Sequence, residues 1–432
     1  MEVVTPAGDD RDGNIMEGLR AKARGWLIVA ELSAVLALVL LPGSSFSAVM
    51  PMVEREWGIS HSQSGLVMAA YQAWYILSVL VLLPLTDRVD ARFVVTASAG
   101  VSAGASILFG LLARGPFAAT ALRAVAGAGL GGVYMPGLRL VSEQYRSSAR
   151  GRAVGVYVAA FVLGNGLSFG ATGSLAAVMN WRAAYLVVSA VSTLAVGLAM
   201  LVPRGRRPEG ATGAKGRRAV SGWLGLGVDW PTMLVIIAYS AHMWEMYGLR
   251  SWMAPYVNSV LVAKGQSGAT AASRAALLTS ASVFLGAAAT GAAGWVSDRC
   301  GRTATASVIM IASAAATLAF GWLAAAPAGA LLGVGLLSSL TVNADSPIFS
   351  AGVTEMVDSS TLGRAMAVQT FLGYAAATAS PALFGWILDA ADGRVGWGVA
   401  FSSMGVVALA GPVALWRLRR MPASRRMCQG RR

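Results

Sequence analysis

Residues 294–302 read Gly-Trp-Val-Ser-Asp-Arg-Cys-Gly-Arg and separate two long apolar stretches. A weaker copy at residues 83–92, Leu-Pro-Leu-Thr-Asp-Arg-Val-Asp-Ala-Arg, keeps the Asp-Arg pair and lacks both glycines. A turn this short between two helices needs glycine where the backbones approach closely, so only the second copy predicts a tight turn. The chain therefore repeats a helix–loop–helix unit in its two halves.

Other landmarks repeat at nearly the same spacing, 211 or 212 residues, and each lies in a loop or at the end of a predicted helix. The landmarks and their copies are Asp87 and Asp298, Glu143 and Glu355, and Arg152 and Arg364. A repeat of this length predicts two similar six-helix halves in parallel orientation.

The chain is too apolar and too poor in charge for a soluble protein. Of its residues, 56% are apolar and 12% are charged, whereas about a quarter are charged in soluble domains. The apolar residues come in stretches of about 20, the length that crosses a bilayer, and 93–112, 183–202 and 303–323 hold no charged side chain. We expect an all-α integral membrane protein with twelve transmembrane helices. They are predicted at 26–49, 63–85, 93–113, 118–142, 153–176, 183–202, 229–258, 272–296, 303–323, 328–352, 365–387 and 395–416.

The net charge of +14 is a topology signal and does not indicate a nucleic-acid partner. When the loops are assigned alternately to two sides, most of the 34 Lys and Arg residues fall on one side, which is expected to be cytoplasmic. We expect a multi-pass protein of the cell (inner) membrane with both termini in the cytoplasm. The predicted organisation is a cytoplasmic tail at 1–25, a six-helix bundle at 26–202, a cytoplasmic linker at 203–228, a second bundle at 229–416 and a basic tail at 417–432.

No pattern in the chain indicates an enzyme. The two cysteines, Cys300 and Cys428, both lie in predicted cytoplasmic segments, so neither a disulfide framework nor a metal site is indicated. The sequence has no nucleotide-binding loop and no nucleophile with an obvious base. We expect a monomer without a cofactor, without a catalytic or metal site, and in contact with lipid.

At this point the chain resembles the major facilitator superfamily, from Trp26 to about Arg417. Residues 294–302 match the family's loop motif Gly-x-x-x-Asp-Arg-x-Gly-Arg, and residues 123–129 are similar to its fourth-helix motif Arg-x-x-x-Gly-x-Gly. The fifth helix lacks the Gly-Pro step of the family's proton antiporters, so the sequence favours drug-type antiport less as the function. The resemblance implies two pseudo-symmetric six-helix bundles around a central cavity and transport by alternating access.

Ionisable side chains inside membrane helices are costly and therefore need a reason. Here they fall on four of the twelve predicted helices, the first, fourth, seventh and tenth, and in the resembled fold these four surround the central cavity. They are Glu31, Arg123, Arg139, Glu143, His242, Glu245, Arg250 and Asp345.

Two arginines predict the charge of the solute. Arg123 and Arg250 are expected at similar depth, in the outer third of the membrane and in opposite halves. A guanidinium grips a carboxylate with two parallel hydrogen bonds and keeps its charge when desolvated, so the pair favours an anion. The alternative is that each arginine is paired internally. Further candidate contacts are Arg139, Asn343, Tyr71, Trp74 and Tyr247.

Three carboxyl groups are candidates for carrying a proton. Desolvation favours the protonated form of a buried carboxyl and a nearby arginine favours the ionised form, so a moving partner makes the group bind or release a proton. Glu245 is the first candidate, followed by Glu31 and Asp345. His242, three residues before Glu245 on the same helix face, either shares this role or is a histidine satisfied by hydrogen bonds.

The repeated loops predict a gate at the cytoplasmic ends of the helices. Asp87 and Asp298 are expected to bond basic residues of adjacent loops when this side is closed; the alternative is that they only maintain topology and packing. The predicted gate comprises Asp87, Arg88, Glu143, Arg150, Arg152, Gly294, Asp298, Arg299, Gly301, Arg302, Glu355 and Arg364.

Together these features predict a secondary active transporter that takes up a small organic anion with protons by alternating access. Two alternatives stay open at this point. One is efflux of a drug or amphiphile by proton antiport, with Glu31, Glu245 and Asp345 as recognition charges. The other is a sensor that binds a solute without moving it.

Overall fold

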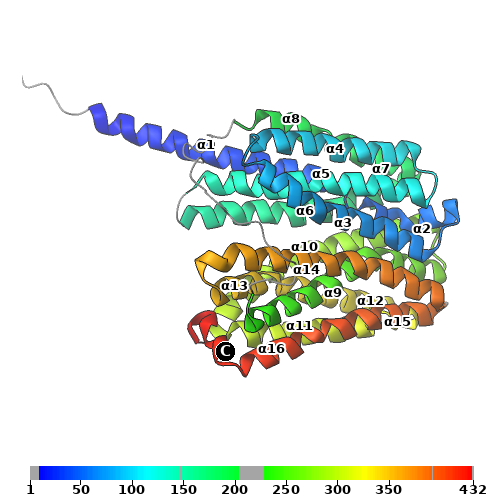
Figure 1. Ribbon diagram of the computed structural model, residues 1–432. Coiled ribbons are helices and arrows are strands. Elements are labelled where there is room, and N and C mark those ends of the chain that lie inside the picture. The colour runs from blue at the N-terminus through cyan, green and yellow to red at the C-terminus, as the bar shows by residue number, and fades with distance from the viewer. Residues whose placement is uncertain (1–8, 146–147, 204–227, 392, 431–432) are drawn as a thin grey trace, which may run out of the picture.

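The computed structural model describes residues 9–145, 148–203, 228–391 and 393–430. Within these ranges the chain forms helices and turns and no strand. The predicted linker at 203–228 and the start of the predicted N-terminal tail lie almost entirely outside them. Figure 1 shows two layers of long helices, α1 to α8 above and α9 to α16 below, which we call the N bundle and the C bundle.

The N bundle contains six membrane crossings. Two of them are interrupted: α1 and α2 form one crossing, and so do α7 and α8. Its helices are α1 (Asp9–Leu40), α2 (Ser45–Trp57), α3 (His61–Leu85), α4 (Ala91–Leu112), α5 (Pro116–Glu143), α6 (Ser148–Val178), α7 (Trp181–Ser192) and α8 (Leu194–Leu201).

The C bundle repeats this arrangement with six more crossings. The tenth crossing is formed by α12 and α13, and the twelfth by α15 and α16. The helices are α9 (Trp230–Ala263), α10 (Gly268–Cys300), α11 (Arg302–Phe320), α12 (Ala328–Ala344), α13 (Ser346–Met356), α14 (Ser359–Ala390), α15 (Gly393–Ala408) and α16 (Ala410–Arg419), with short 3-10 helices η2 (Leu323–Ala325) and η3 (Pro422–Gly430).

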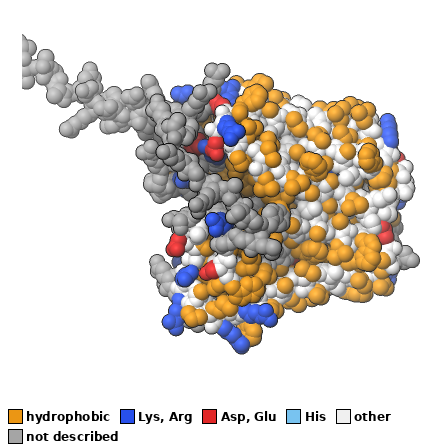
Figure 2. Space-filling view, viewed as in Figure 1, with side chains coloured by type: hydrophobic (Ala, Val, Ile, Leu, Met, Phe, Trp, Pro, Cys, Tyr) orange, Lys and Arg blue, Asp and Glu red, His pale blue; other side chains and the backbone are white. Residues whose placement is uncertain are grey.

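The helices have the length and apolar surface that a bilayer requires. Eleven segments of the described chain, 19 to 35 residues long, are apolar enough to cross a membrane. Helix α9, with 34 residues, is the seventh crossing and brings the total to twelve; it is more polar because it carries His242, Glu245 and Arg250. Figure 2 shows hydrophobic side chains over the flanks of both bundles and charged side chains at the two ends. The all-α, twelve-helix prediction is confirmed.

The first crossing differs from its prediction. It was expected at 26–49, but α1 already begins at Asp9, inside the predicted tail, and the crossing continues through α2 to Trp57. The helix is interrupted at 41–44, where Pro42 has no backbone N–H to donate and Gly43 has no side chain to restrict it. The apolar pattern resumes beyond this break, so α1 and α2 together form one long crossing.

The two bundles meet mainly along two pairs of helices, and α2 also contacts α9 and α10. Helix α3 packs against α14, and α6 packs against α10. In the second pair small residues bring the backbones together: a side chain added at Gly173 would collide with Ala276, and one added at Gly170 would meet Ser280. Close contact through small residues is the usual basis of helix packing in membranes. The space between these pairs contains the candidate site.

Candidate solute-binding site

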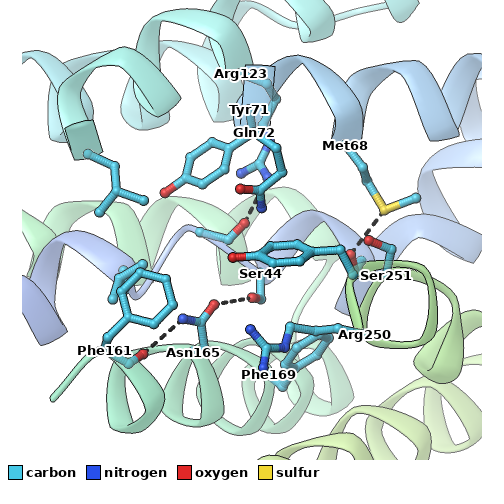
Figure 3. A pocket seen from close by; sticks show the side chains of 15 residues that line it. Ser44, Met68, Tyr71, Gln72, Arg123, Phe161, Asn165, Phe169, Arg250 and Ser251 are labelled. Atoms are coloured by element: carbon cyan, nitrogen blue, oxygen red, sulfur yellow. Dashed lines mark hydrogen bonds between the residues drawn. The ribbon is translucent and has the colours of Figure 1, made fainter. Parts of the chain in front are cut away.

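A cavity lies between the two bundles, with an empty volume of about 480 Å³ including its open part. We call it the central cavity. The α1–α2 break, α3, α5 and α6 form its N-bundle wall, and α9 forms its C-bundle wall (Figure 3). It is lined by Leu40, Gly43, Ser44, Ser47, Met68, Tyr71, Gln72, Arg123, Leu130, Phe161, Asn165, Phe169, Tyr247, Arg250 and Ser251.

Arg123 of α5 holds the break in the first crossing. Its Nη1 and Nη2 atoms donate to the carbonyl oxygens of Pro42 (3.2 Å) and Gly43 (2.8 Å), which the interrupted helix leaves without partners. The guanidinium carbon also lies 4.2 Å from the ring centre of Tyr71. The internal pairing considered as an alternative therefore applies to Arg123, with carbonyl groups as its partners and not a carboxylate.

Helix α6 fastens the same break from another side. The backbone N–H of Ser44 donates to Ser168 Oγ at 3.0 Å, and Ser44 Oγ donates to Asn165 Oδ1 at 3.0 Å. Ser45 Oγ and Thr172 Oγ1 lie 2.7 Å apart. These bonds keep non-helical backbone at the cavity wall, where its polar groups are satisfied inside the protein.

Arg250 of α9 reaches the cavity from the opposite bundle, and Figure 3 shows the two arginines on opposite sides. Its Nη2 donates to Asn343 Oδ1 at 3.1 Å, and its guanidinium carbon lies 5.6 Å from the ring centre of Tyr247. In the described chain neither Arg123 nor Arg250 has a carboxylate within the 4.0 Å of an ion pair. None of the described residues that line the cavity is Asp or Glu. The site is therefore cationic.

A second group of ionisable side chains is buried inside the C bundle. His242 Nδ1 lies 2.8 Å from Asp345 Oδ1, and His242 Nε2 lies 2.7 Å from Ser346 Oγ. Glu245 Oε1 accepts hydrogen bonds from Ser313 and Thr317 of α11, as described below. We call His242, Glu245, Asp345, Ser313, Thr317 and Ser346 the C-bundle cluster. The exposed fractions of His242, Glu245 and Asp345 are 1%, 1% and 2%, so all three side chains are buried in the bundle.

Glu245 faces away from the central cavity. Its Oε1 atom accepts from Ser313 Oγ at 2.8 Å and from Thr317 Oγ1 at 2.7 Å. Helix α9 therefore presents two polar faces, with Arg250 toward the N bundle and Glu245 toward α11. Glu245 lies on one of the four helices expected around the central cavity, but its side chain does not line that cavity in this structure.

The α12–α13 junction connects the C-bundle cluster with the cavity. Asn343, near the end of α12, accepts from Arg250, and Asp345, which interrupts the tenth crossing, pairs with His242. Asn343 Nδ2 also donates to the carbonyl of Ser339 at 2.7 Å, which orients its amide. Arg250 and the His242–Asp345 pair are thus linked through Asn343, which lies two residues before Asp345.

At the end of the molecule that carries the chain termini, each bundle has an acid–arginine–acid cluster. In the N bundle Arg139 binds Asp87 (2.5 Å) and Glu143 (2.9 Å). In the C bundle Arg302 binds Asp298 (2.6 Å) and Glu355 (2.8 Å). The carboxylates occupy repeat-equivalent positions, whereas the arginine comes from α5 in one half and from the start of α11 in the other.

The sequence model of the Major Facilitator Superfamily matches residues 32–272 and 262–427. The chain belongs to the Major Facilitator Superfamily. It is therefore a secondary transporter, a multi-pass membrane protein that moves a small solute, and the transporter family speaks against an enzyme.

Solved structures share the fold at low sequence identity. A bacterial homologue of the human lysosomal transporter Spinster, inward-facing and occupied, has a TM-score of 0.72 and 15% identity over 91% of this chain and 96% of the other. The same protein, inward-facing and unoccupied, gives 0.68 and 16% over 94% and 98%. The xylose transporter XylE from E. coli, inward open, gives 0.69 and 14% over 91% and 96%. No curated protein sequence matches the chain.

Some predicted cavity residues of this superfamily member lie elsewhere. Trp74 is 51% exposed on the outer surface, because Tyr71 and Tyr75, four residues apart, take the inward face of α3. Arg139 belongs to the N-bundle acid–arginine–acid cluster. Glu31, half-buried on α1, does not line the central cavity. The structure corrects these three placements, while Arg123, Arg250, Tyr71 and Tyr247 do line the cavity.

The superfamily loop also departs in part from its prediction. Gly301 has φ +95° and is the single residue between α10 and α11, so the tight turn is confirmed. An added Cβ at Gly294 meets nothing within 4 Å, so no close approach explains that glycine. In the first copy Asp90 caps α4 by accepting from the N–H of Arg92, which replaces the glycine turn with a longer one.

The expected partners of the loop aspartates also differ. Asp87 pairs with Arg139 of its own bundle, whereas Arg150, Arg152 and Arg364 are exposed. Arg88 is exposed as well, and Arg299 lies over the ring of Trp295, 3.5 Å from its centre. A latch between adjacent loops stays a prediction for a conformation in which this end is closed.

Sequence reasoning missed the uncharged polar residues of the cavity. Ser44, Ser47, Gln72 and Asn165 line it, but they carry no charge that would mark them as unusual in a membrane helix. Two signals were present: the Pro42-Gly43 pair inside an apolar stretch, and the amide of Asn165 inside the long apolar helix α6.

Proposed function

We propose that this transporter takes up a small organic anion together with protons. The observation that carries the proposal is that Arg123 and Arg250, from opposite bundles, line one cavity whose described lining contains no carboxylate. Buried charges in membranes are normally paired or functional. An anionic solute supplies the missing negative charge and, being held by both bundles, allows closure of the halves around it.

The two arginines have different roles in this proposal. Arg123 donates hydrogen bonds from Nη1 and Nη2 to the carbonyls of Pro42 and Gly43. It therefore holds the break and contributes positive potential to the cavity. Arg250 Nη2 donates a hydrogen bond of 3.1 Å to the neutral amide oxygen of Asn343. A carboxylate is a stronger acceptor for a guanidinium than an amide oxygen. Arg250 is therefore the principal solute ligand.

The remaining lining describes the rest of the solute. Phe161, Phe169 and Tyr247 offer apolar and aromatic surface, whereas Asn165 and Gln72 offer amide groups. A few polar groups in a mostly apolar pocket orient a small molecule and select it. The proposed class is a small carboxylate with an apolar body and at least one further polar group.

Proton coupling is proposed to reside in the C-bundle cluster. When the solute carboxylate binds the guanidinium of Arg250, Asn343 loses its hydrogen bond from Arg250. The α12–α13 junction transmits this loss to Asp345. The pairing of Asp345 with His242 at 2.8 Å then changes, and with it the number of protons that the pair holds. Glu245, three residues from His242 on α9, is the third proton-carrying group.

Efflux of cations is less well supported by the same geometry. Glu245 and Asp345 are buried inside the C bundle, and Glu31 is outside the cavity lining. A cationic amphiphile entering the cavity would meet two guanidiniums and no carboxylate among the described lining residues. The positive potential favours an anion.

A thermal-shift screen of the purified protein tests the solute class. The panel contains organic anions, cations and amphiphiles, and is repeated on Arg250→Ala, Arg123→Ala and, as a control at an exposed arginine, Arg299→Ala. We expect stabilisation by carboxylates, lost in Arg250→Ala and kept in Arg299→Ala. Stabilisation by cations alone, or full carboxylate binding by both cavity variants, overturns the anion proposal. Counterflow of the labelled hit in proteoliposomes then separates a transporter of that solute from a sensor.

A further inference from the structure

The end of the molecule opposite the chain termini holds a contact between the bundles that the transport site does not use. Figure 1 shows the α2–α3 turn and the C-terminal end of α14 at this end, which we call the distal face and which the predicted topology places outside the cell. Here the carboxylate of Asp389, near the end of α14, accepts from the backbone N–H groups of His61 (2.9 Å) and Ser62 (2.8 Å). It also accepts from the hydroxyl of Ser62.

These two N–H groups are the ones that α3 leaves unpaired. The first turn of a helix has N–H groups without an intrahelical partner. In α3 a capping box satisfies two nearby groups: Ser60 Oγ accepts from the N–H of Gln63, and Gln63 Oε1 accepts from the N–H of Ser60. The N–H groups of His61 and Ser62 remain, and a carboxylate from the other bundle accepts both. The positive end of the α3 dipole also favours this negative charge.

The helices cross at reciprocal glycines just inside this contact. A Cβ added at Gly65 of α3 would lie 2.5 Å from the carbonyl oxygen of Pro381 on α14. A Cβ added at Gly385 of α14 would collide with the carbonyl oxygen of His61. Because each helix supplies one glycine, the backbones touch at two points. Backbone contact at this crossing brings Asp389 within reach of the first turn of α3.

The ring of His61 adds an aromatic contact to the same crossing. It lies 5.9 Å from the ring centre of Trp252 and 6.3 Å from that of Trp397, both in the C bundle. Its Nδ1 atom lies 3.0 Å from Glu54 Oε1 in its own bundle, which holds the ring in place. Residue 61 therefore binds the C bundle through its backbone and through its side chain.

From this geometry we infer that Asp389 and the α3–α14 glycine crossing form a latch that holds the distal face closed. Opening that face requires the carboxylate to leave α3 and return to water, where both it and the exposed N–H groups are hydrated, so the latch is reversible. The inference concerns the conformational cycle and does not depend on the identity of the solute or of the coupling ion.

Distance measurements between spin labels test the latch without any solute. The full chain carries Cys300→Ser and Cys428→Ser, with labels at the exposed distal positions Arg114→Cys and Arg394→Cys. We expect a mainly short distance in the parent. In Asp389→Asn, which is nearly isosteric and uncharged, the ratio of short to long distances falls roughly tenfold, as expected from loss of charge-assisted hydrogen bonds.

Two matched controls and one independent variant complete the test. Asp358→Asn removes an exposed carboxylate at the other end of α14, and Gly333→Ala adds a methyl group where nothing lies within 4 Å; both should keep the parent distribution. Gly385→Ala should lengthen the distance by blocking the crossing. An unchanged distribution in folded Asp389→Asn overturns the latch. If that variant does not fold, Gly385→Ala decides by the same measurement, and no shift there overturns it.

Discussion

His242 Nδ1 lies 2.8 Å from Asp345 Oδ1 inside the C bundle, and neither side chain is more than 2% exposed. Asp345 also sits where the tenth crossing is interrupted, two residues beyond the amide that binds Arg250. The buried pair is thus attached to a backbone segment whose Asn343 binds Arg250, a residue of the cavity wall. This relationship is the physical basis of the coupling proposal, because a pair whose geometry changes also changes its affinity for protons.

Asp345→Asn should separate exchange from accumulation. The substitution keeps a hydrogen-bonding group beside His242 but removes the charge. We expect solute counterflow at close to the parent rate and loss of accumulation driven by a pH gradient. Both are measured in proteoliposomes loaded with the solute that the thermal-shift screen identifies. Asp358→Asn, at an exposed site, is the control; normal gradient-driven accumulation in Asp345→Asn would exclude Asp345 from coupling.

Glu245→Gln should fold and should show a weaker dependence of solute uptake on pH. Gln resembles a protonated carboxyl group and its Oε1 can still accept from Ser313 and Thr317, so we expect the melting temperature to stay the same or rise. The dependence of solute uptake on pH should become flatter, because one proton-binding group has been removed. The paired measurement is a melting curve and an uptake profile across pH. A large fall in melting temperature with an unaltered pH profile would assign Glu245 a structural role only.

Substitutions of the two cavity arginines should have different effects on solute binding and on stability. Arg250→Lys keeps the charge but loses the planar guanidinium that can donate two parallel hydrogen bonds. We expect at least about tenfold weaker solute binding with little change in melting temperature. Arg123→Lys leaves one of the carbonyls of Pro42 and Gly43 without its donor, at a cost of about 1–3 kcal/mol. It should lower the melting temperature as well as the affinity. Equal effects on stability would contradict the division of roles.

The two glycines of the loop motif should differ in their tolerance of alanine. Gly301 has φ +95° and ψ 144°, a region that side chains rarely adopt, so Gly301→Ala should cost about 1–3 kcal/mol. Gly294→Ala meets no atom within 4 Å and lies inside α10, where alanine is the better helix former. It should be neutral or slightly stabilising. Thermal unfolding of both purified variants provides the comparison, and a stable Gly301→Ala would remove the strain argument.

Much of the site could be predicted because charge is rare in this chain. Arg123 and Arg250 stood out as ionised groups inside apolar stretches, and both line the central cavity. The same rule misplaced Glu245 and Glu31, since rarity marks a residue as special without indicating which way it points. Trp74 was misplaced for a related reason: α3 has no Asp, Glu, Lys or Arg, so no charge distinguishes its face toward lipid from its face toward the protein.

The sequence by itself determined that the chain is a twelve-helix membrane protein of two related halves, because bilayer-length apolar stretches, Arg-rich loops and a repeat are all readable along one dimension. Only the tertiary structure decided that Arg123 holds the first-helix break, that Glu245 faces α11, and that Asp389 caps α3. In a bilayer both the buried and the lipid-facing sides of a helix are apolar, so no polar face orients it. Which residues meet therefore depends on how small side chains let the helices and bundles approach.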